Sequence, residues 1–469
     1  DVFNLDTDVV FDLFEKLVNI ADLSTELCFD SLDSCGKVTG WRRPASLLRI
    51  HGFSFEAVIQ FSLFTESVDS YYVKDLGYVN SYFENVVEDT FQTAHLLNFQ
   101  FGGNVTTAVL PRAELLAGIT DSKFLSALSG STEPLSRAEI AVITSISKPS
   151  MSQSARRLSD KGLIVTIGKR IAGKGGVATL FALNPDYAHS VALDVALRSI
   201  SMRVTAFDGS TLFESRVNLE INDEAPHVIN VAQKMLDQAT ALVSSPRQCV
   251  AVSIANPIDM RTGGTAPLPN SAFPAGRFTP DKDLNLNSPM VLVDNDVNWA
   301  TIAEHNSGVA QGLANFIYVY IGDGMGAGLF IDGAVRRGSH GLAGEIGFIK
   351  DESGLDLTQR LAAEGFGRET SYGLDTVAMM SALSAADHKK LDAGIENVAH
   401  NIVNMATLLD PEAIVLGGAL TEKNYISDMI ASQIAEKSIS DIDVLVGKFS
   451  PLEGAAGAAH AATCKSVGF

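Results

Sequence analysis

Residues 291–298 read Val-Leu-Val-Asp-Asn-Asp-Val-Asn, an apolar run that ends in two carboxylates and two amides. Such a run is typical of a buried β-strand, and a helical pattern follows it through Glu304. In open α/β sheets, ligands bind beyond the carboxyl ends of the strands, where polar side chains of this kind gather. The stretch therefore predicts an α/β fold with a ligand site at Asn295 and Asp296.

A second strand and a glycine-rich turn follow this site. Residues 316–321 read Phe-Ile-Tyr-Val-Tyr-Ile, and residues 322–328 read Gly-Asp-Gly-Met-Gly-Ala-Gly. Glycines at this density let backbone N–H groups approach an anion or another backbone closely. A hairpin turn at Asp332-Gly333 then leads to residues 338–348, which contain Glu345. Three ordered motifs therefore occupy one short stretch of the chain.

These motifs together resemble the ROK family of sugar kinases and sugar-responsive repressors. The matching residues are Asn-Asp-Val-Asn at 295–298, the glycine turn at 322–328, and Arg-Gly-x-x-Gly-Leu-Ala-Gly-Glu-Ile-Gly at 337–347. The resemblance covers residues 113–469. It implies an α/β, two-lobed, actin-like (ribonuclease-H-like) sugar-binding domain. It also implies that sugar hydroxyls are bound by Asn270, Asn295, Asp296 and Glu345, although Asn270 suits a simple turn equally well.

Length and composition place the chain among soluble globular proteins. A chain of 469 residues is long enough for two to four domains, and its 46% apolar and 19% charged residues are ordinary for such proteins. No apolar run reaches the roughly 18 residues of a transmembrane helix. The four cysteines, Cys28, Cys35, Cys249 and Cys464, are too few and too scattered for a disulfide scaffold. We therefore expect a cytoplasmic protein without a membrane partner.

Charge is distributed unevenly along the chain. Residues 1–110 carry 6 basic and 16 acidic side chains, residues 111–183 carry 10 and 5, and residues 184–469 carry 19 and 34. A net charge of −20 opposes binding of nucleic acid by the whole surface. One short basic segment inside an acidic protein is typical of a DNA-binding module attached to a small-molecule sensor.

The basic segment has the pattern of a helix-turn-helix followed by a wing. Ser136 and Glu139 form a capping box that begins the first helix, which continues through Ile143. Ser147 suits the N-cap of a second helix, 151–161, with a proline in its first turn. Strands at 163–167 and 178–183 flank a basic, glycine-rich hairpin. The alternative is a surface helical hairpin whose charges are merely solvated.

The segment also resembles the winged helix-turn-helix of ROK repressors. That resemblance places Ser152 and Gln153 at base edges and the neighbouring cations at phosphates. One departure is that residues 175–177 read Gly-Gly-Val where the family wing has Gly-Arg-Pro, which leaves Lys174 as the nearest cation. The predicted DNA-binding residues are Lys148, Ser150, Ser152, Gln153, Arg156, Arg157, Lys161 and Lys174.

The choice between kinase and repressor depends on the phosphate turns. Phosphoryl transfer needs a base on the acceptor hydroxyl, and Asp296 matches the family's base. Residues 194–199 read Asp-Val-Ala-Leu-Arg-Ser where the kinases have an Asp-x-Gly-Gly-Thr type loop. Asp323 stands where threonine is common, and a negative charge there repels a triphosphate. A non-catalytic repressor is therefore favoured, and the alternative is an ATP-dependent ROK sugar kinase with Asp296 as catalytic residue.

The family's zinc site is not expected in this chain. Phe348 replaces the histidine that follows Gly-Glu-Ile-Gly in the family, and the family's cysteine cluster is missing between Cys249 and Cys464. Tetrahedral zinc needs about four N or S ligands close together. The sequence therefore predicts no metal site and no cofactor.

The expected organisation has four parts. Residues 1–112 form an extension of unknown fold, with 17 of the 35 aromatic residues of the chain in 1–110. Residues 113–184 form the DNA-binding domain. Residues 185–300 form the first sugar-sensing lobe, to which a closing helix at 452–469 returns, and residues 301–451 form the second. The expected partners are operator DNA, a sugar or sugar-phosphate inducer, and further copies in a homodimer or higher oligomer.

Overall fold

The computed structural model describes residues 112–172, 176–220, 223–269, 278–368, 373–384, 388–421 and 424–469. The chain divides into two compact units, Asp1–Thr107 and Ala108–Phe469, and everything described below belongs to the second. The predicted N-terminal extension, except Arg112, lies outside the described residues. None of the described helices is long and apolar enough to cross a membrane.

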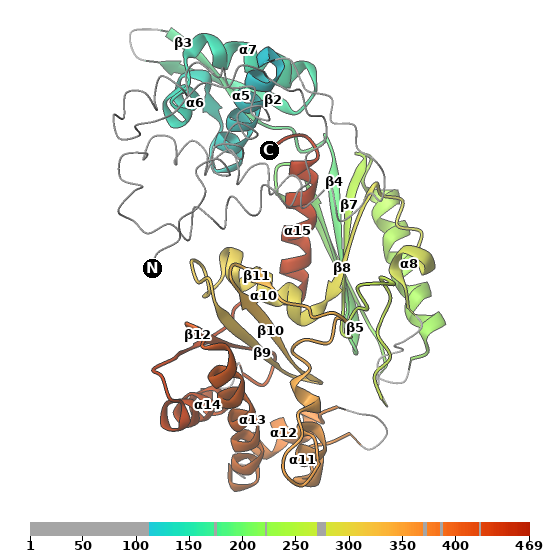
Figure 1. Ribbon diagram of the computed structural model, residues 1–469. Coiled ribbons are helices and arrows are strands. Elements are labelled where there is room, and N and C mark those ends of the chain that lie inside the picture. Colours follow the sequence, from blue (N-terminus) through green and yellow to red (C-terminus); the bar gives the residue numbers. More distant parts are fainter. Residues whose placement is uncertain are drawn as a thin grey trace, which may run out of the picture. The chain divides into compact units, whose positions relative to one another are not determined.

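Three helices and a small antiparallel sheet form the domain at residues 112–183, which we call the α5–β3 domain (Figure 1). Its sheet has the order β1-β3-β2, and β2 and β3 form a long hairpin. Both predicted strands are longer than expected and extend into the basic turn. The elements are α5 (Arg112–Ser129), β1 (Leu135–Ser136), α6 (Arg137–Thr144), α7 (Lys148–Asp160), β2 (Ile164–Ala172) and β3 (Gly176–Leu183).

Both predicted helix caps are confirmed. The Ser136 hydroxyl accepts from the Glu139 backbone N–H, and the Glu139 carboxylate accepts from the Ser136 N–H, which completes the capping box of α6. The Ser147 hydroxyl caps α7, with a proline in the first turn. Because the apolar residues of α7 repeat at helical spacing, one face is buried against α5, α6 and β2. That buried face includes Met151, Ala155 and Leu158, as predicted.

The first lobe is a five-stranded sheet of order β6-β5-β4-β7-β8, with α8 on one face and α15 on the other (Figure 1). β4, β7 and β8 are parallel, so their carboxyl ends meet at one edge. The elements are β4 (His189–Val195), β5 (Ser199–Ala206), β6 (Thr211–Asn218), α8 (Ala225–Leu242), β7 (Arg247–Ile254), α9 (Pro280–Asp283), β8 (Met290–Asn295) and α15 (Pro451–Lys465).

The second lobe is built on a mixed sheet of order β11-β10-β9-β12-β13. Helix α10 packs on β9 and β10 of this sheet and also on α15, so it joins the two lobes. The remaining elements are α10 (Asp296–Ser307), β9 (Phe316–Ile321), β10 (Met325–Ile331), β11 (Ala334–Val335), the 3₁₀ turn η2 (Ile346–Phe348), α11 (Leu357–Ala363), α12 (Thr376–Ser384), α13 (His388–Leu409), β12 (Ala413–Gly417), α14 (Asn424–Lys437) and β13 (Asp443–Val446).

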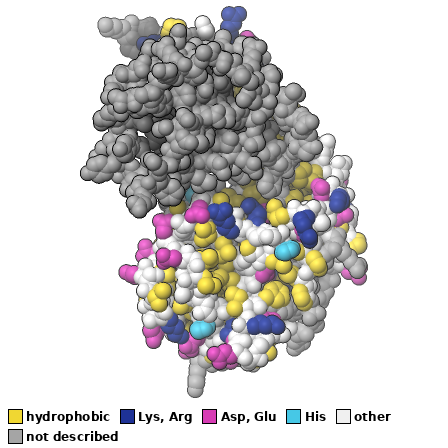
Figure 2. Space-filling view, in the orientation of Figure 1, with side chains coloured by type: hydrophobic (Ala, Val, Ile, Leu, Met, Phe, Trp, Pro, Cys, Tyr) yellow, Lys and Arg dark blue, Asp and Glu magenta, His cyan; other side chains and the backbone are white. Residues whose placement is uncertain are grey.

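Acidic, basic and hydrophobic side chains are interspersed on the face of the described lobes seen in Figure 2. The mixture agrees with the acidic balance of residues 184–469, which carry 19 basic and 34 acidic side chains. The visible surface of the lobes is thus unlike the phosphate-binding face of a nucleic-acid reader, where cations gather on one side.

A buried carboxylate holds the end of α10 to the segment that precedes α15. Glu304 is fully buried, and its carboxylate accepts from the backbone N–H groups of Val309 at 2.9 Å, Lys448 at 2.5 Å and Phe449 at 2.7 Å. The three donors would be left without an acceptor if the carboxylate were removed. Glu304 is therefore a structural residue where the chain passes from β13 to α15.

We predict that Glu304→Ala lowers the free energy of unfolding by several kcal/mol, because each buried donor left unsatisfied costs roughly 1–3 kcal/mol. Urea denaturation measures the change. Glu436→Ala, at an exposed position of α14, is the matched control and should stay within about 0.5 kcal/mol of the wild-type protein. Equal denaturation midpoints for the two variants would contradict the structural role of Glu304.

Candidate functional site

A cavity of about 310 Å³ lies where the carboxyl ends of β4, β7 and β8 face the β9–β10 turn. Its volume is at the lower end of the range of about 300–1,000 Å³ found for small-molecule sites. The cavity brings together three of the predicted sugar-binding residues and both predicted phosphate turns. Its lining includes Arg198, Asn295, Asp296, Asp323, Glu345 and Arg368.

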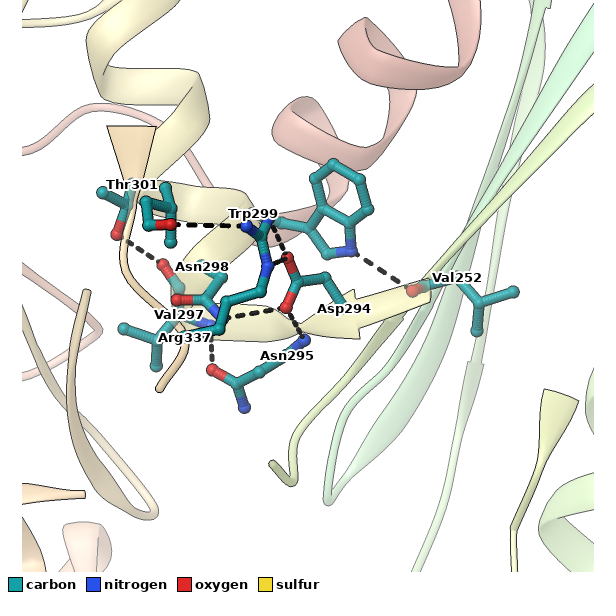
Figure 3. A network of polar contacts seen from close by, with 9 residues as sticks. Val252, Asp294, Asn295, Val297, Asn298, Trp299, Thr301 and Arg337 are labelled. Atoms are coloured by element: carbon teal, nitrogen blue, oxygen red, sulfur yellow. Dashed lines mark hydrogen bonds and ion pairs between the residues drawn. The ribbon is translucent and has the colours of Figure 1, made fainter. Parts of the chain in front are cut away.

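The wall of the cavity at the end of β8 is fixed by a buried ion pair (Figure 3). The Asp294 carboxylate, whose residue is 3% exposed, accepts from the Arg337 guanidinium at 2.6 Å and from the Asn298 amide at 2.8 Å. It also accepts from the Asn295 backbone N–H at 2.8 Å. Because Arg337 belongs to the segment after β11, the pair connects the strand–helix junction to the second lobe.

Asp294 and Arg337 were not singled out from the sequence. Both lie within motifs described above, Asp294 in the Asp-Asn-Asp run and Arg337 in the Arg-Gly motif, so each could have been proposed as a site residue from the sequence. Their pairing across 43 residues of chain was not readable from either motif alone.

Asn295 caps α10 and positions its neighbour. Its side-chain oxygen accepts from the Val297 backbone N–H at 3.0 Å, and its amide donates to the Asp296 carboxylate at 2.8 Å and to the Ile254 carbonyl at 3.3 Å. Both polar atoms of Asn295 therefore have partners within the protein. The contact of Asn295 with sugar stays a prediction, whereas its hydrogen bond to Asp296 is present in the structure.

Asp296 and Glu345 are carboxyl groups with strongly raised pKa values. Burial raises the pKa of Asp296 to about 8, and the nearby Asp194 and Glu345 carboxylates add to the effect. Burial alone raises the pKa of Glu345 to about 7. Burial likewise raises the pKa of Asp194 to about 6, against a hydrogen bond from the Ser253 hydroxyl at 2.6 Å. Near neutral pH, Asp296 therefore holds a proton and can donate to a sugar oxygen as well as accept from a hydroxyl.

The phosphate end of the cavity is occupied by an ion pair. The Arg198 guanidinium, in the β4–β5 turn, donates to the Asp323 carboxylate of the β9–β10 turn at 2.8 Å. The Thr376 hydroxyl donates to the other carboxylate oxygen at 2.8 Å, and Arg368 donates to the Asp323 carbonyl at 2.6 Å. The Asp323 charge is therefore compensated.

The sequence predicts that the negative charge of Asp323 repels a triphosphate. That prediction requires correction, because Arg198 lies beside Asp323 and compensates its charge. The ion pair lies at this end of the cavity, together with Ala196 and Leu197, which also line it.

Two predicted binding residues, Asn270 and Lys174, lie outside the described residues. Phe348, which stands in place of the family's histidine, lines the cavity. Within the described ranges, no group of three or more histidine, cysteine, aspartate and glutamate side chains is placed to hold a metal ion.

Most of the predicted DNA-binding residues lie on the accessible side of α7. Lys148, Gln153, Arg156 and Lys161 are exposed, and Ser150 and Ser152 are partly exposed. The Ser152 hydroxyl donates to the Lys148 carbonyl at 3.0 Å and accepts from the Arg137 guanidinium at 3.2 Å. Arg137, at the start of α6, was missed from the sequence because only the tertiary fold places it beside α7.

Arg157, one of the predicted phosphate contacts, has an ion-pair partner inside the protein. Its guanidinium donates to both carboxylate oxygens of Asp121 in α5, at 3.1 and 2.7 Å, and the Ser154 hydroxyl donates to the same carboxylate at 2.5 Å. Asp121 is 7% exposed, so the pair is largely enclosed between the helices. Arg157 therefore holds α7 against α5. Its side chain stays 34% exposed, and its contact with phosphate stays a prediction.

The comparisons with known proteins agree with this geometry. Residues 190–366 match the ROK family. The chain carries a ROK family domain. A xylose repressor from Caldicellulosiruptor bescii is 23% identical over 360 residues, which cover 67% of this chain and 90% of that protein. A glucokinase from Halalkalibacterium halodurans is 30% identical over 164 residues, which cover 28% of this chain and 49% of that protein.

A solved structure with the same fold is that of a ROK family transcriptional regulator described as a homologue of the E. coli MLC protein. It is 18% identical, with a TM-score of 0.53, and the match covers 75% of this chain and 98% of that chain. At this identity the likeness shows the fold alone. The predicted two-lobed, actin-like α/β fold of the ROK domain is thereby confirmed, and the domain boundaries stay predictions.

The raised pKa of Asp296 predicts a pH dependence of stability. Because its pKa is about 8 in the folded protein and 3.8 ordinarily, the folded state binds the extra proton between these values. Stability therefore falls as the pH rises from about 4 to about 8. Asp296→Asn removes this contribution. The melting temperature of the variant, relative to that of the wild-type protein, should therefore increase between about pH 5 and pH 8.5.

Differential scanning fluorimetry across this pH range measures the effect. Asp332→Asn is the control, because Asp332 is an exposed carboxylate in a left-handed backbone conformation that asparagine tolerates. If the difference in melting temperature between Asp296→Asn and the wild-type protein were the same at all pH values, the pKa of Asp296 would not be raised in the folded protein.

Proposed function

We propose that this protein is a sugar-responsive, DNA-binding transcriptional repressor whose kinase-like cleft binds its ligand without phosphorylating it. The observation that carries the proposal is the asymmetry of the cleft. The sugar end keeps Asp296 and Glu345, while the Arg198–Asp323 ion pair fills the phosphate end. The match to a protein named xylose repressor over 90% of its length supports the same function.

In this proposal the α5–β3 domain is a winged helix-turn-helix. Helix α7 is its recognition helix, with Gln153 and Ser152 at base edges and Lys148, Arg156 and Lys161 at phosphates. Ser150 lies at the start of α7, and Arg137 adds a cation beside the recognition helix. The β2–β3 hairpin is the wing, on which Lys174 is the proposed cation. Two copies of the domain would read a two-fold operator, so the protein acts as a homodimer or higher oligomer.

The ligand end of the cleft suits a sugar because its groups can both donate and accept. A carboxyl group that holds a proton donates to a ring or hydroxyl oxygen, and an ionised one accepts from a hydroxyl. Asp296 and Glu345 have pKa values of about 8 and about 7, so both forms are accessible near neutral pH. Asn295 and Asn270 complete the proposed sugar contacts, and the ligand is a sugar or a sugar phosphate.

The second candidate is an ATP-dependent sugar kinase, favoured by the similarity to a glucokinase. In that case Asp296 would take the proton of the acceptor hydroxyl, as a catalytic base. A coupled assay for ADP release separates the two functions. Steady ADP release with glucose or xylose that is lost in Asp296→Ala would establish the kinase, and its absence alongside sugar-sensitive DNA binding would establish the repressor.

The test of the repressor uses the duplex that the wild-type protein enriches from a randomised library. Fluorescence anisotropy then measures the affinity for this duplex with and without xylose, glucose or glucose 6-phosphate. We expect at least one of these sugars to weaken binding by about 5- to 150-fold, the usual range of coupling between two sites. Absence of any selected duplex would overturn the DNA-binding proposal.

We predict that Asp296→Asn lowers sugar affinity about 10- to 100-fold near pH 8, because a hydrogen bond to a charged group contributes roughly 1.5–3 kcal/mol. Duplex binding without sugar should survive, since Asn295, and not Asp296, is the N-cap of α10. Isothermal titration calorimetry measures the sugar affinity. Asp332→Asn again serves as the control, and an unchanged affinity in Asp296→Asn would remove Asp296 from the sugar site.

We predict different effects for neighbouring positions of α7. Gln153→Ala should relax the preference at one base pair, by about 1–3 kcal/mol, whereas Arg156→Ala should weaken all duplexes alike and reduce the salt dependence. Arg157→Ala should instead lower the melting temperature, because it leaves the buried Asp121 carboxylate without its cation. Identical behaviour of Gln153→Ala and Arg156→Ala on scrambled duplexes would show that Gln153 reads no base.

A further inference from the structure

Helix α15 touches both the ligand cleft region and the α5–β3 domain. It packs on β4 and β7 of the first lobe and runs along α10, whose first residue is Asp296. Its far end, together with the residues that follow it, belongs to the hydrophobic core of the α5–β3 domain. At about 1.5 Å per residue, its 15 residues span about 22 Å.

The contact of α15 with α10 is made by backbone and leaves no room for adjustment. A Cβ atom at Gly454 would lie 1.9 Å from the Trp299 carbonyl oxygen, so only glycine permits this approach. The Trp299 indole N–H donates to the Val252 carbonyl at 3.2 Å, which fixes α10 to β7 as well (Figure 3). Ala455 and Ala459, both fully buried, belong to the same cluster as Trp299 and residues of β4 and β7.

Small residues matter here because they have no side-chain rotamers that could accommodate a shift of the neighbouring helix. A long side chain can change rotamer when its neighbour shifts, whereas backbone packed against backbone moves as one body. α10 and α15 are therefore expected to move together when the residues at the start of α10 shift.

The other end of α15 enters the core of the α5–β3 domain. Cys464 is buried in that core, which also contains Phe124 of α5, and Val467 and Phe469 pack against it. The Phe469 ring meets the Phe207 ring edge-on, with centroids 5.8 Å apart. The Phe207 carbonyl lies 3.2 Å from the His460 ring nitrogen Nε2 of α15. The α5–β3 domain is thus attached to the first lobe by this end of the helix as well as by the chain between β3 and β4.

We propose that α15 transmits the ligand state of the cleft to the α5–β3 domain. A sugar that reorders Asp296 moves the start of α10, α10 carries α15 with it through the Gly454–Trp299 contact, and Cys464, Val467 and Phe469 displace the core on which α7 rests. The inference rests on the proposed repressor function, because it names the route by which sugar would change DNA binding.

The first experiment needs neither sugar nor DNA. Gly454→Ala perturbs the contact with α10, whereas Gly457→Ala makes the same substitution in the same helix where a Cβ atom meets nothing within 4 Å. Hydrogen exchange of the amides of α5 and β3 is measured in both variants. We expect faster exchange in Gly454→Ala and wild-type exchange in Gly457→Ala. Wild-type exchange in α5 and β3 of a folded Gly454→Ala protein would overturn the proposal.

The second experiment uses Phe469→Ala, which weakens the far contact and leaves the helix and cleft unaltered. Affinity for the selected duplex is measured with and without saturating xylose, or glucose if only glucose binds. We expect sugar and duplex each to bind within about 3-fold of wild type, while the sugar effect on duplex affinity falls from about 5- to 150-fold to below about 2-fold.

The outcomes separate this inference from the function on which it rests. A wild-type protein whose duplex binding ignores every sugar would refute the repressor function, and the exchange experiment would still decide whether α15 couples the two regions. A wild-type sugar effect that persists in full in Phe469→Ala would refute transmission through α15 and leave the repressor function standing. Gly457→Ala should show the same sugar effect on duplex affinity as the wild-type protein.

Discussion

The cleft depends on one buried carboxylate, Asp294, because it defines both the end of β8 and the position of the second lobe. Its partners are the Asn298 amide of α10, the Asn295 backbone and the Arg337 guanidinium from beyond β11. A buried charge is costly unless it is paired and hydrogen-bonded, and loss of one partner of such a pair typically costs about 3–5 kcal/mol. The geometry that presents Asp296 to the cleft therefore requires both lobes.

Local chemistry accounts for the features that could be read from the sequence. The caps at Ser136 and Ser147, the buried face of α7 and the strand that ends at Asn295 all depend on residues a few positions apart. The Asp121–Arg157 and Arg198–Asp323 pairs join positions 36 and 125 residues apart, and neither is visible as a pattern. From the sequence, a cation on α7 predicts a phosphate contact, and only the fold shows that a carboxylate of α5 lies beside it.

The Arg198–Asp323 pair also gives a physical reason for the proposal that the cleft binds its ligand without a nucleotide. In a phosphoryl-transfer enzyme, the two turns that face each other across the cleft approach the phosphates through backbone groups. Here each turn contributes one charge, and the two charges satisfy each other at 2.8 Å. Both side chains are partly exposed, at 41% and 23%, so the pair adds little stability by itself and acts mainly by occupying the space.

The protonation of the cleft fits binding better than catalysis. A general base must be ionised before its substrate arrives, yet Asp296 has a pKa of about 8, raised by burial and by its acidic neighbours. Asp194 and Glu345, with pKa values of about 6 and about 7, ionise before Asp296 as the pH rises, and their negative charges favour the protonated form of Asp296. In the proposed repressor, a protonated Asp296 can donate to a sugar oxygen, and an ionised Asp296 can accept from a sugar hydroxyl.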